Sequence, residues 1–272
     1  MQTYNDIASA IFDFLLAPFG HEIALFDLIV WPLLMGVGAL QVYKYTSNQD
    51  AIVSVKRQIS MHLLEIRLFR DDIAQVLLST IKIVGKNVIY IAHNLRPMAV
   101  MTIPMVGLMV QLVAHYADEP AQPGSVEILH LRLDPNAAVS SRDVSLEVPV
   151  GTSLDAPAVR TADGQVFWRV RADQPGDYVF KIRVGDEIYE KGWAVGGAAR
   201  KIPVKRLRSW EALLYPGEDA IPSGSPVLSL ELDMHTRSLD FVWDGEFGIL
   251  MWAMVLSLVA GVALKDFFDV TL

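Results

Sequence analysis

The sequence predicts a membrane α-helical protein, with three transmembrane helices and a cytoplasmic helical hairpin, joined to an extracytoplasmic all-β sandwich. Three observations predict this class. Apolar segments of membrane length occupy residues 23–43, 97–116 and 247–264. The connection 44–96 repeats apolar residues at helical spacing, whereas the segment 118–238 alternates apolar and polar residues as strands do.

The composition fits a few membrane spans plus a soluble domain. The 272 residues are 52% hydrophobic, and their mean hydropathy is +0.33. A net charge of -8, without a basic surface interleaved with aromatic residues, argues against nucleic acid as a partner. The chain contains no cysteine, which excludes disulfides, thiolate metal sites and a cysteine nucleophile.

No catalytic motif is found along the chain. The sequence lacks the H-E-x-x-H, G-x-S-x-G and phosphate-loop patterns, and its histidines are scattered. We therefore expect a protein that is not an enzyme, with no catalytic residue, no metal and no cofactor.

Each predicted span is short or interrupted. The first carries Asp27 near its outer end, the second has no charge after Arg96, and the third has no charge at all. Prolines and glycines are tolerated inside a membrane where neighbouring helices or water satisfy the freed backbone groups. The interrupting residues are Pro32, Gly36, Gly38, Pro104, Gly107 and Gly261.

The distribution of basic residues predicts the orientation. Eight Lys and Arg residues lie in the connection 44–96, whereas the first 27 residues contain neither. Basic residues near span ends are retained on the cytoplasmic side. We therefore expect a multi-pass protein of the plasma (inner) membrane, with its amino terminus outside and its carboxyl terminus in the cytoplasm.

Residues 1–20 are expected to form an amphipathic helix on the outer membrane surface. Ile7, Ile11, Phe14 and Leu15 share one helical face, while polar residues occupy the other side. In the alternative interpretation this segment is a short helix packed on the β domain.

The connection 44–96 is predicted to form a cytoplasmic helical hairpin. Apolar residues from Ile52 to Val76 advance by alternating three and four positions, a heptad seam in which His62 is the polar member. Asp71 or Asp72 is placed to cap the second helix. The residue before a proline disfavours helix, so Pro97 is expected to mark a joint before the next span.

An alternative makes residues 73–92 a fourth span. Lys82 and Lys86 lie at its middle, where each charge costs about 2.5–3.5 kcal/mol, so this alternative is disfavoured. The apolar excess instead predicts a hairpin that lies near the membrane or binds a partner. Its candidate contacts with anionic headgroups or a partner are Arg67, Arg70, Lys82, Lys86 and Arg96.

The segment 118–238 predicts a β-sandwich. Clean alternation marks residues 144–150, 178–184 and 228–234, and turn signals such as Asp163-Gly164 separate the strands. Residues 166–196 resemble consecutive strands of an immunoglobulin-like domain, with Trp168 as a core anchor. The absence of cysteine excludes the antibody-type disulfide.

A basic cluster follows these strands and consists of Arg200, Lys201, Lys205, Arg206 and Arg208. Trp210, Leu214 and Tyr215 come next in the chain. Two interpretations stay open: a short amphipathic segment that contacts anionic lipid or a partner, and a solvated face beside a strand edge. Trp243, just before the last span, is interpreted as an interfacial anchor.

The order of these elements resembles the YidC/Oxa-type membrane protein insertase superfamily, especially its three-span members. The resemblance covers residues 7–116 and the last span, and residues 68–112 carry it. Its motifs are Arg70-Asp71-Asp72 at the hairpin turn, Asn94 with Pro97 at re-entry, and Ile103-Pro104 inside the next span. The chain departs from the family pattern because its first span lacks an arginine and residues 118–238 separate the last two spans.

The resemblance implies a protein that assists hydrophobic segments into the bilayer through a groove between its spans, without nucleotide. Methionines on one face of residues 97–116 can repack around clients of different shape. In the alternative interpretation they fill gaps between helices. The candidate groove residues are Gln41, Met98, Met101, Thr102, Met105, Met109, Gln111 and Ser257.

A second functional class stays open. The protein is then a membrane-anchored structural or adaptor protein whose β domain binds a protein partner. The expected partners are the lipid bilayer, nascent or client membrane proteins, and a partner of the β domain.

Overall fold

The computed structural model describes residue 10 and residues 24–137, 139, 143–197, 200–239 and 241–270. The amphipathic helix predicted over residues 1–20 lies outside the described residues, apart from residue 10. The chain divides into two compact units. We call Met1–Leu28 with Leu108–Trp252 the β unit, and Ile29–Gly107 with Ala253–Leu272 the helical unit.

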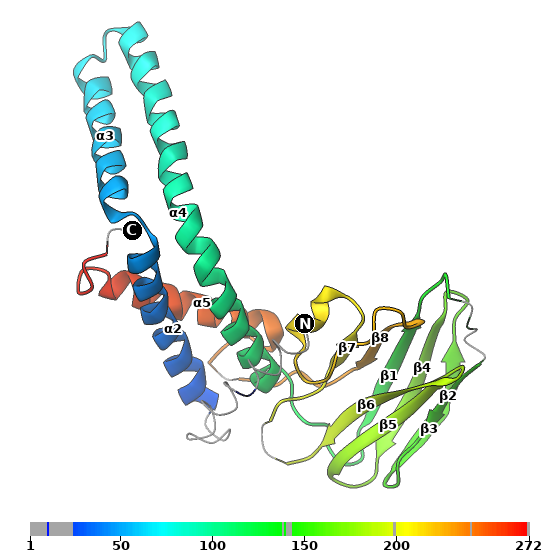
Figure 1. The fold of residues 1–272 in the computed structure, drawn as a ribbon. Coiled ribbons are helices and arrows are strands. Elements are labelled where there is room, and N and C mark those ends of the chain that lie inside the picture. Colours follow the sequence, from blue (N-terminus) through cyan, green and yellow to red (C-terminus); the bar gives the residue numbers. More distant parts are fainter. Residues whose placement is uncertain are drawn as a thin grey trace. The chain divides into compact units, whose positions relative to one another are not determined.

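In the part of the chain that the structure describes, three helices are long and apolar enough to cross a membrane. They are α2 (Ala24–Thr46), α4 (Ile73–Tyr116) and α5 (Gly245–Leu264), labelled in Figure 1. The sheets lie between the second and third of these helices in the chain. The predicted order of three long apolar helices, with a β region between the second and third, is therefore confirmed.

A helical hairpin follows α2. Helix α3 (Gln49–Leu68) begins at Asn48, whose side chain accepts a hydrogen bond from the Ala51 amide at 3.1 Å. The chain turns back over residues 69–72, and α4 begins with the Gln75 amide donating to Asp72 Oδ1 at 3.1 Å. Each carboxylate or amide oxygen satisfies a backbone donor that a helix start leaves free. Asp72 is thus the cap that the sequence predicts at this turn.

The joint predicted at Pro97 is wrong, because α4 continues through both Pro97 and Pro104. A proline disfavours a helical conformation of the preceding residue without forbidding it, and α4 runs on past Pro97. At 1.5 Å per residue, 44 residues extend about 66 Å, roughly twice the hydrocarbon thickness of a bilayer. Only part of α4 can therefore lie within the membrane.

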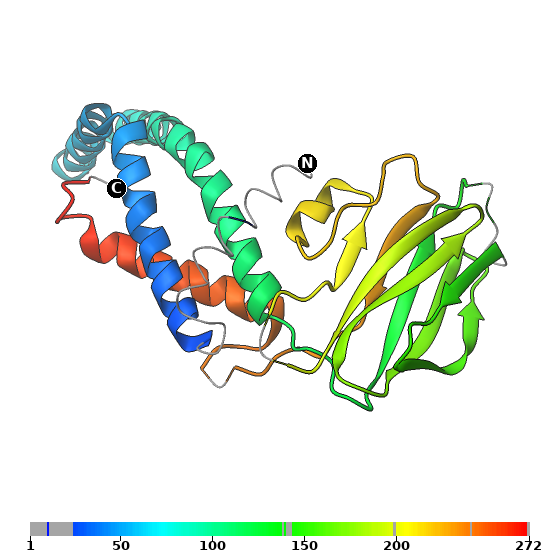
Figure 2. The same ribbon diagram turned by 60° about the horizontal axis from the view of Figure 1, so that its bottom comes forward.

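The described β region forms two antiparallel sheets in a sandwich-like arrangement, seen as separate layers in Figure 2. The five-stranded sheet has the order β3-β4-β1-β8-β7, and the three-stranded sheet has the order β2-β5-β6. The strands are β1 (Val126–Leu133), β2 (Val144–Glu147), β3 (Thr152–Arg160), β4 (Gln165–Ala172), β5 (Gly176–Val184), β6 (Glu187–Val195), β7 (Lys205–Leu207) and β8 (Val227–Leu232).

The core of the sandwich lies between the two sheets. On one sheet Leu129 pairs with Trp168, which is 2% exposed, so the predicted core role of this tryptophan is confirmed. On the other sheet Phe180 stacks on Trp193 with ring centroids 5.5 Å apart. Alternate residues of β1, β4 and β5 thus bury one face, as the sequence pattern predicts.

Backbone hydrogen bonds join the sandwich to the end of α4 within the β unit. The Ile202 amide donates to the Ala114 carbonyl at 3.2 Å, and the Arg237 amide donates to the Ala117 carbonyl at 2.9 Å. Helix carbonyls at a carboxyl end have no intrahelical donor, so these bonds satisfy them. The β-sandwich is consequently attached to α4 by backbone contacts as well as by chain connectivity.

Candidate functional site

An apolar pocket of about 350 Å³ lies between α2, α4 and α5 within the helical unit. Each of the candidate spans contributes to it, and three of its side chains are methionines. The lining residues are Gly36, Ala39, Leu40, Tyr43, Met101, Met105, Met254, Val255, Ser257, Leu258, Gly261 and Val262.

Close approach of two helix backbones forms one side of the pocket. A Cβ atom on Gly36 would overlap the Ser257 carbonyl oxygen and would lie 2.9 Å from the Ala260 Cβ atom. On the opposite helix, Ser257 and Gly261 are spaced four residues apart, the small-residue spacing that lets membrane helices pack closely. Gly36 therefore brings α2 against α5 and sets the distance between the walls.

The polar groups of the lining already have partners. The Ser257 hydroxyl donates to the Met254 carbonyl of its own helix at 2.9 Å. The Tyr43 hydroxyl donates to Asn94 Oδ1, and the Asn94 amide donates to the Tyr90 carbonyl at 2.7 Å. A polar guest would have to compete for these groups, so the pocket suits an apolar guest.

The structure brings together three of the predicted groove residues, namely Met101, Met105 and Ser257. Met98 lies outside the lining and is 57% exposed. The Thr102 hydroxyl donates to the Met98 carbonyl at 2.8 Å and is turned onto its own helix.

The remaining candidates also lie outside the lining. Gln41 and Met109 are half-buried, and Gln111 is 2% exposed and belongs to the β unit. Sequence reasoning missed Tyr43, Gly36 and Met254 as pocket residues. The small-residue spacing on the last span was the signal that could have found the α2–α5 contact.

A carboxylate links the two helices of the hairpin. His62 Nδ1 lies 2.9 Å from Glu65 Oε2, and the fully buried Ser79 donates to the same oxygen at 2.8 Å. These hydrogen bonds lower the pKa of Glu65 from its ordinary value. Ile52 and Val55 are buried at the base of the predicted seam, whereas Ile73 at the tip is 83% exposed.

The basic residues of the hairpin are placed mainly toward solvent. Arg67, Arg70, Lys82 and Arg96 are exposed, and Lys86 is half-buried. Arg70 Nε lies 3.8 Å from Asp71 Oδ1, an exposed pair of little energetic weight. The hairpin thus exposes both positive charge and apolar side chains.

The basic residues after β6 make contacts with other groups of the β unit. Arg200 pairs with Asp177 at 2.5 Å, and Arg208 pairs with Asp134 at 2.7 Å. Arg206 donates to the carbonyls of Glu190 and Asp219. Lys205 Nζ lies 3.9 Å from Glu231 and 5.2 Å from the Tyr215 ring centroid. Lys201 also takes part in an interaction.

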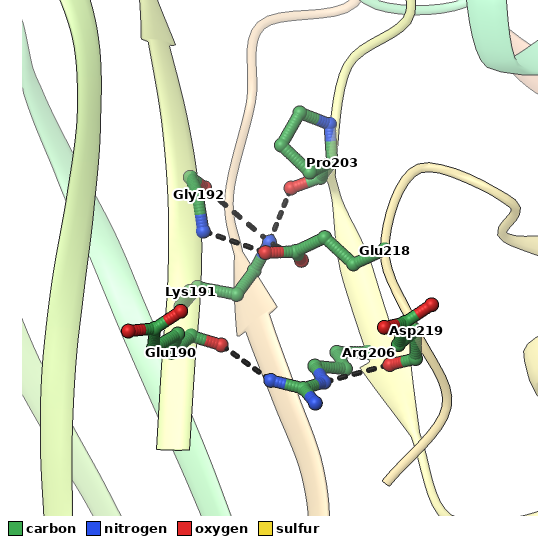
Figure 3. A network of polar contacts seen from close by, with 7 residues as sticks. All are labelled: Glu190, Lys191, Gly192, Pro203, Arg206, Glu218 and Asp219. Carbon is green, nitrogen blue, oxygen red and sulfur yellow. Dashed lines mark hydrogen bonds and ion pairs between the residues drawn. The ribbon is translucent and has the colours of Figure 1, made fainter. Parts of the chain in front are cut away.

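A buried charge pair fixes the segment after β6 to the three-stranded sheet (Figure 3). The Lys191 ammonium is fully buried and donates to Glu218 Oε2 at 2.5 Å and to the Pro203 carbonyl. Glu218 Oε1 accepts from the Gly192 amide at 2.6 Å. Burial lowers the pKa of Lys191. The network supports the fold of the sandwich and is separate from the pocket.

The fold and the pocket define a candidate multi-pass membrane protein, with three apolar helices among its described residues and a β region between the second and third. Comparison with protein-family models, with curated proteins and with solved structures gave no match.

Proposed function

We propose that the protein is an insertase-like membrane factor that holds an apolar segment of a client membrane protein against α2, α4 and α5. The step needs no nucleotide and no covalent chemistry. In this proposal the hairpin faces the cytoplasm, and the β-sandwich lies on the other side of the membrane. The order of elements that resembles the YidC/Oxa-type superfamily agrees with this function.

The observation that carries the proposal is the chemistry of the pocket. Met101 and Met105 of α4 face the same space as Met254 of α5. Methionine is unbranched and polarisable, so it can repack around guests of different shape. A volume of about 350 Å³ is at the small end of the usual range for ligand sites, so the pocket fits a few side chains of a passing segment.

Site-specific photocrosslinking tests this function. A crosslinking amino acid is placed at Met105, which lines the pocket, or at Met98, which is exposed on the same helix. The probe is a stalled nascent chain of a single-span membrane protein, in membranes that contain the full-length protein. We expect strong crosslinks from position 105 and few from position 98. Equal yields at both positions, or crosslinks from 105 to lipid alone, would contradict the proposal.

A second candidate function is that of an adaptor, favoured by the edge of the five-stranded sheet. Among the described strands, β3 pairs only with β4, and its exposed apolar residues include Leu154 and Val159. An edge strand of this kind can accept a partner strand. The immunoglobulin-like likeness of residues 166–196 agrees with a binding role. Replacing Val159 with Lys should abolish partner binding in an adaptor and leave client crosslinking from position 105 intact.

A further inference from the structure

We propose that the short helix η3 (Trp210–Leu214) is a membrane-interface anchor, which places Trp210 and Leu214 in the headgroup layer and does not require anionic lipid. The proposal rests on α5 crossing the membrane, and it is independent of client binding. Helix η3 and the start of α5, up to Trp252, belong to the β unit.

The first argument is the position of η3 next to the start of α5. Tyr215 directly follows η3, and burial together with the charge of Glu246 raises its pKa. Glu246 lies in the first turn of α5. Lys205 lies over the Tyr215 ring and also senses the charge of Glu246. The short yellow helix of Figure 1 is thus followed directly by a tyrosine that senses the charge of a residue in the first turn of a candidate span.

The second argument is the exposure of aromatic and apolar side chains at this level. Trp210 is 64% exposed and Leu214 is 38% exposed. Around the first turn of α5, Trp243 is 71% exposed and Phe247 is 69% exposed. Tryptophan is enriched at membrane interfaces because its ring is amphipathic. One lipid interface thus accounts for four exposed side chains from two separate segments.

The third argument concerns charge. Arg206 and Arg208, which precede η3, are used in contacts with Glu190, Asp219 and Asp134. The exposed charge on η3 itself is Glu211, which would be repelled by anionic headgroups. Insertion therefore depends on apolar and aromatic area, and the anchor should be equally deep in uncharged bilayers.

Nitroxide labelling of the full-length chain tests the anchor, because the absence of cysteine allows single-site labelling. The label is attached at Leu214→Cys, with Val150→Cys as the control in the turn before β3, where Val150 is 99% exposed. In phosphatidylcholine nanodiscs we expect the label at 214 to collide mainly with oxygen. The label at 150 should collide mainly with a water-soluble nickel chelate. Equal nickel accessibility at both sites would overturn the proposal.

A second measurement does not depend on the label. Brominated phosphatidylcholine should quench more of the tryptophan fluorescence in the native chain than in Trp210→Phe, and an equal quenched fraction would overturn the anchor. Adding phosphatidylglycerol should leave the depth at position 214 unchanged. If position 214 inserts only when phosphatidylglycerol is present, the claim that the anchor does not require anionic lipid is overturned.

Discussion

Lys191 Nζ lies 2.5 Å from Glu218 Oε2, with the lysine side chain fully buried and the glutamate 16% exposed. Removing one member of such a pair leaves an uncompensated charge. We therefore expect Lys191→Met to lower the free energy of unfolding of the sandwich by about 3–5 kcal/mol. Denaturant unfolding in detergent, followed by the fluorescence of the core tryptophans, measures this loss.

The double substitution of Lys191→Met with Glu218→Gln should recover part of that stability. A glutamine oxygen can still accept from the Gly192 amide, and no charge is left without a partner. Lys181→Met on the exposed side of β5 is the control for the loss of one lysine. A Lys191→Met protein as stable as this control would show that the pair contributes nothing.

Asp118 gives a prediction for pH. Burial and, as a smaller effect, the charge of Glu246 together raise the pKa of Asp118 to about 6. The folded protein then holds a proton that the unfolded chain releases near pH 4, so stability falls as the pH rises toward 6. The substitution Asp118→Asn removes this loss of stability, because asparagine does not titrate. At pH 7.5 we expect a gain of about 1 kcal/mol, since the carboxyl is partly solvated and therefore screened.

Thermal unfolding at pH 7.5 and pH 4.5 measures the effect of Asp118→Asn. The difference in Tm between the variant and the native protein should shrink at the lower pH. Glu119→Gln serves as the control for removing a negative charge at the next position. A Tm difference that is the same at both pH values would refute the role of Asp118 titration.

Gly36 and Gly38 form a matched pair on α2. A Cβ atom at Gly36 meets the backbone of α5, whereas one at Gly38 has nothing within 4 Å. We expect Gly36→Ala to destabilise the protein by about 1–3 kcal/mol through overpacking. Gly38→Ala should be neutral or slightly stabilising. Tm values of the purified variants in one detergent measure both effects, and equal values would argue against close packing of α2 on α5.

The Glu65 carboxylate gives a prediction for the hairpin. Ser79→Ala removes a buried hydrogen bond between the two helices and should weaken their contact by about 0.5–1.5 kcal/mol. Thr80→Ala is the control, because the Thr80 hydroxyl donates to Val76 of its own helix. Hydrogen exchange of the hairpin amides should accelerate in the first variant. Unchanged protection in both would mean that Ser79 does not hold the hairpin.

Much of the architecture could be predicted from periodicity. The spans, the cap at Asp72 and the strands with strict alternation follow from local patterns that the tertiary structure preserves. Strand β3 was missed because register shifts around Ala156 interrupt its alternation of apolar and polar residues. Strand β7 was missed because a strand of three residues is too short to show an alternating pattern. The continuous α4 was mispredicted because a proline disfavours a helical conformation of the preceding residue without forbidding it.

The candidate site was predictable only in part. The methionine spacing found Met101 and Met105, since both lie on one face of one helix. Whether each of the other candidate residues lines the pocket depends on its tertiary contacts, which the spacing along the chain does not show. Residues 200–208 show this most clearly, because a run of positive charge does not reveal the acidic side chains and carbonyls that surround it.

The backbone contact at Gly36 has a consequence for how the pocket adapts. Two helices that already touch along their main chains cannot be pressed closer, and separating them forfeits dispersion energy along the contact. We therefore expect the pocket to adapt to a guest mainly through rotamer exchange of the surrounding thioethers and not through a change in the spacing of α2 and α5. Methyl relaxation of Met101, Met105 and Met254 should therefore report occupancy while the frame of the helices stays still.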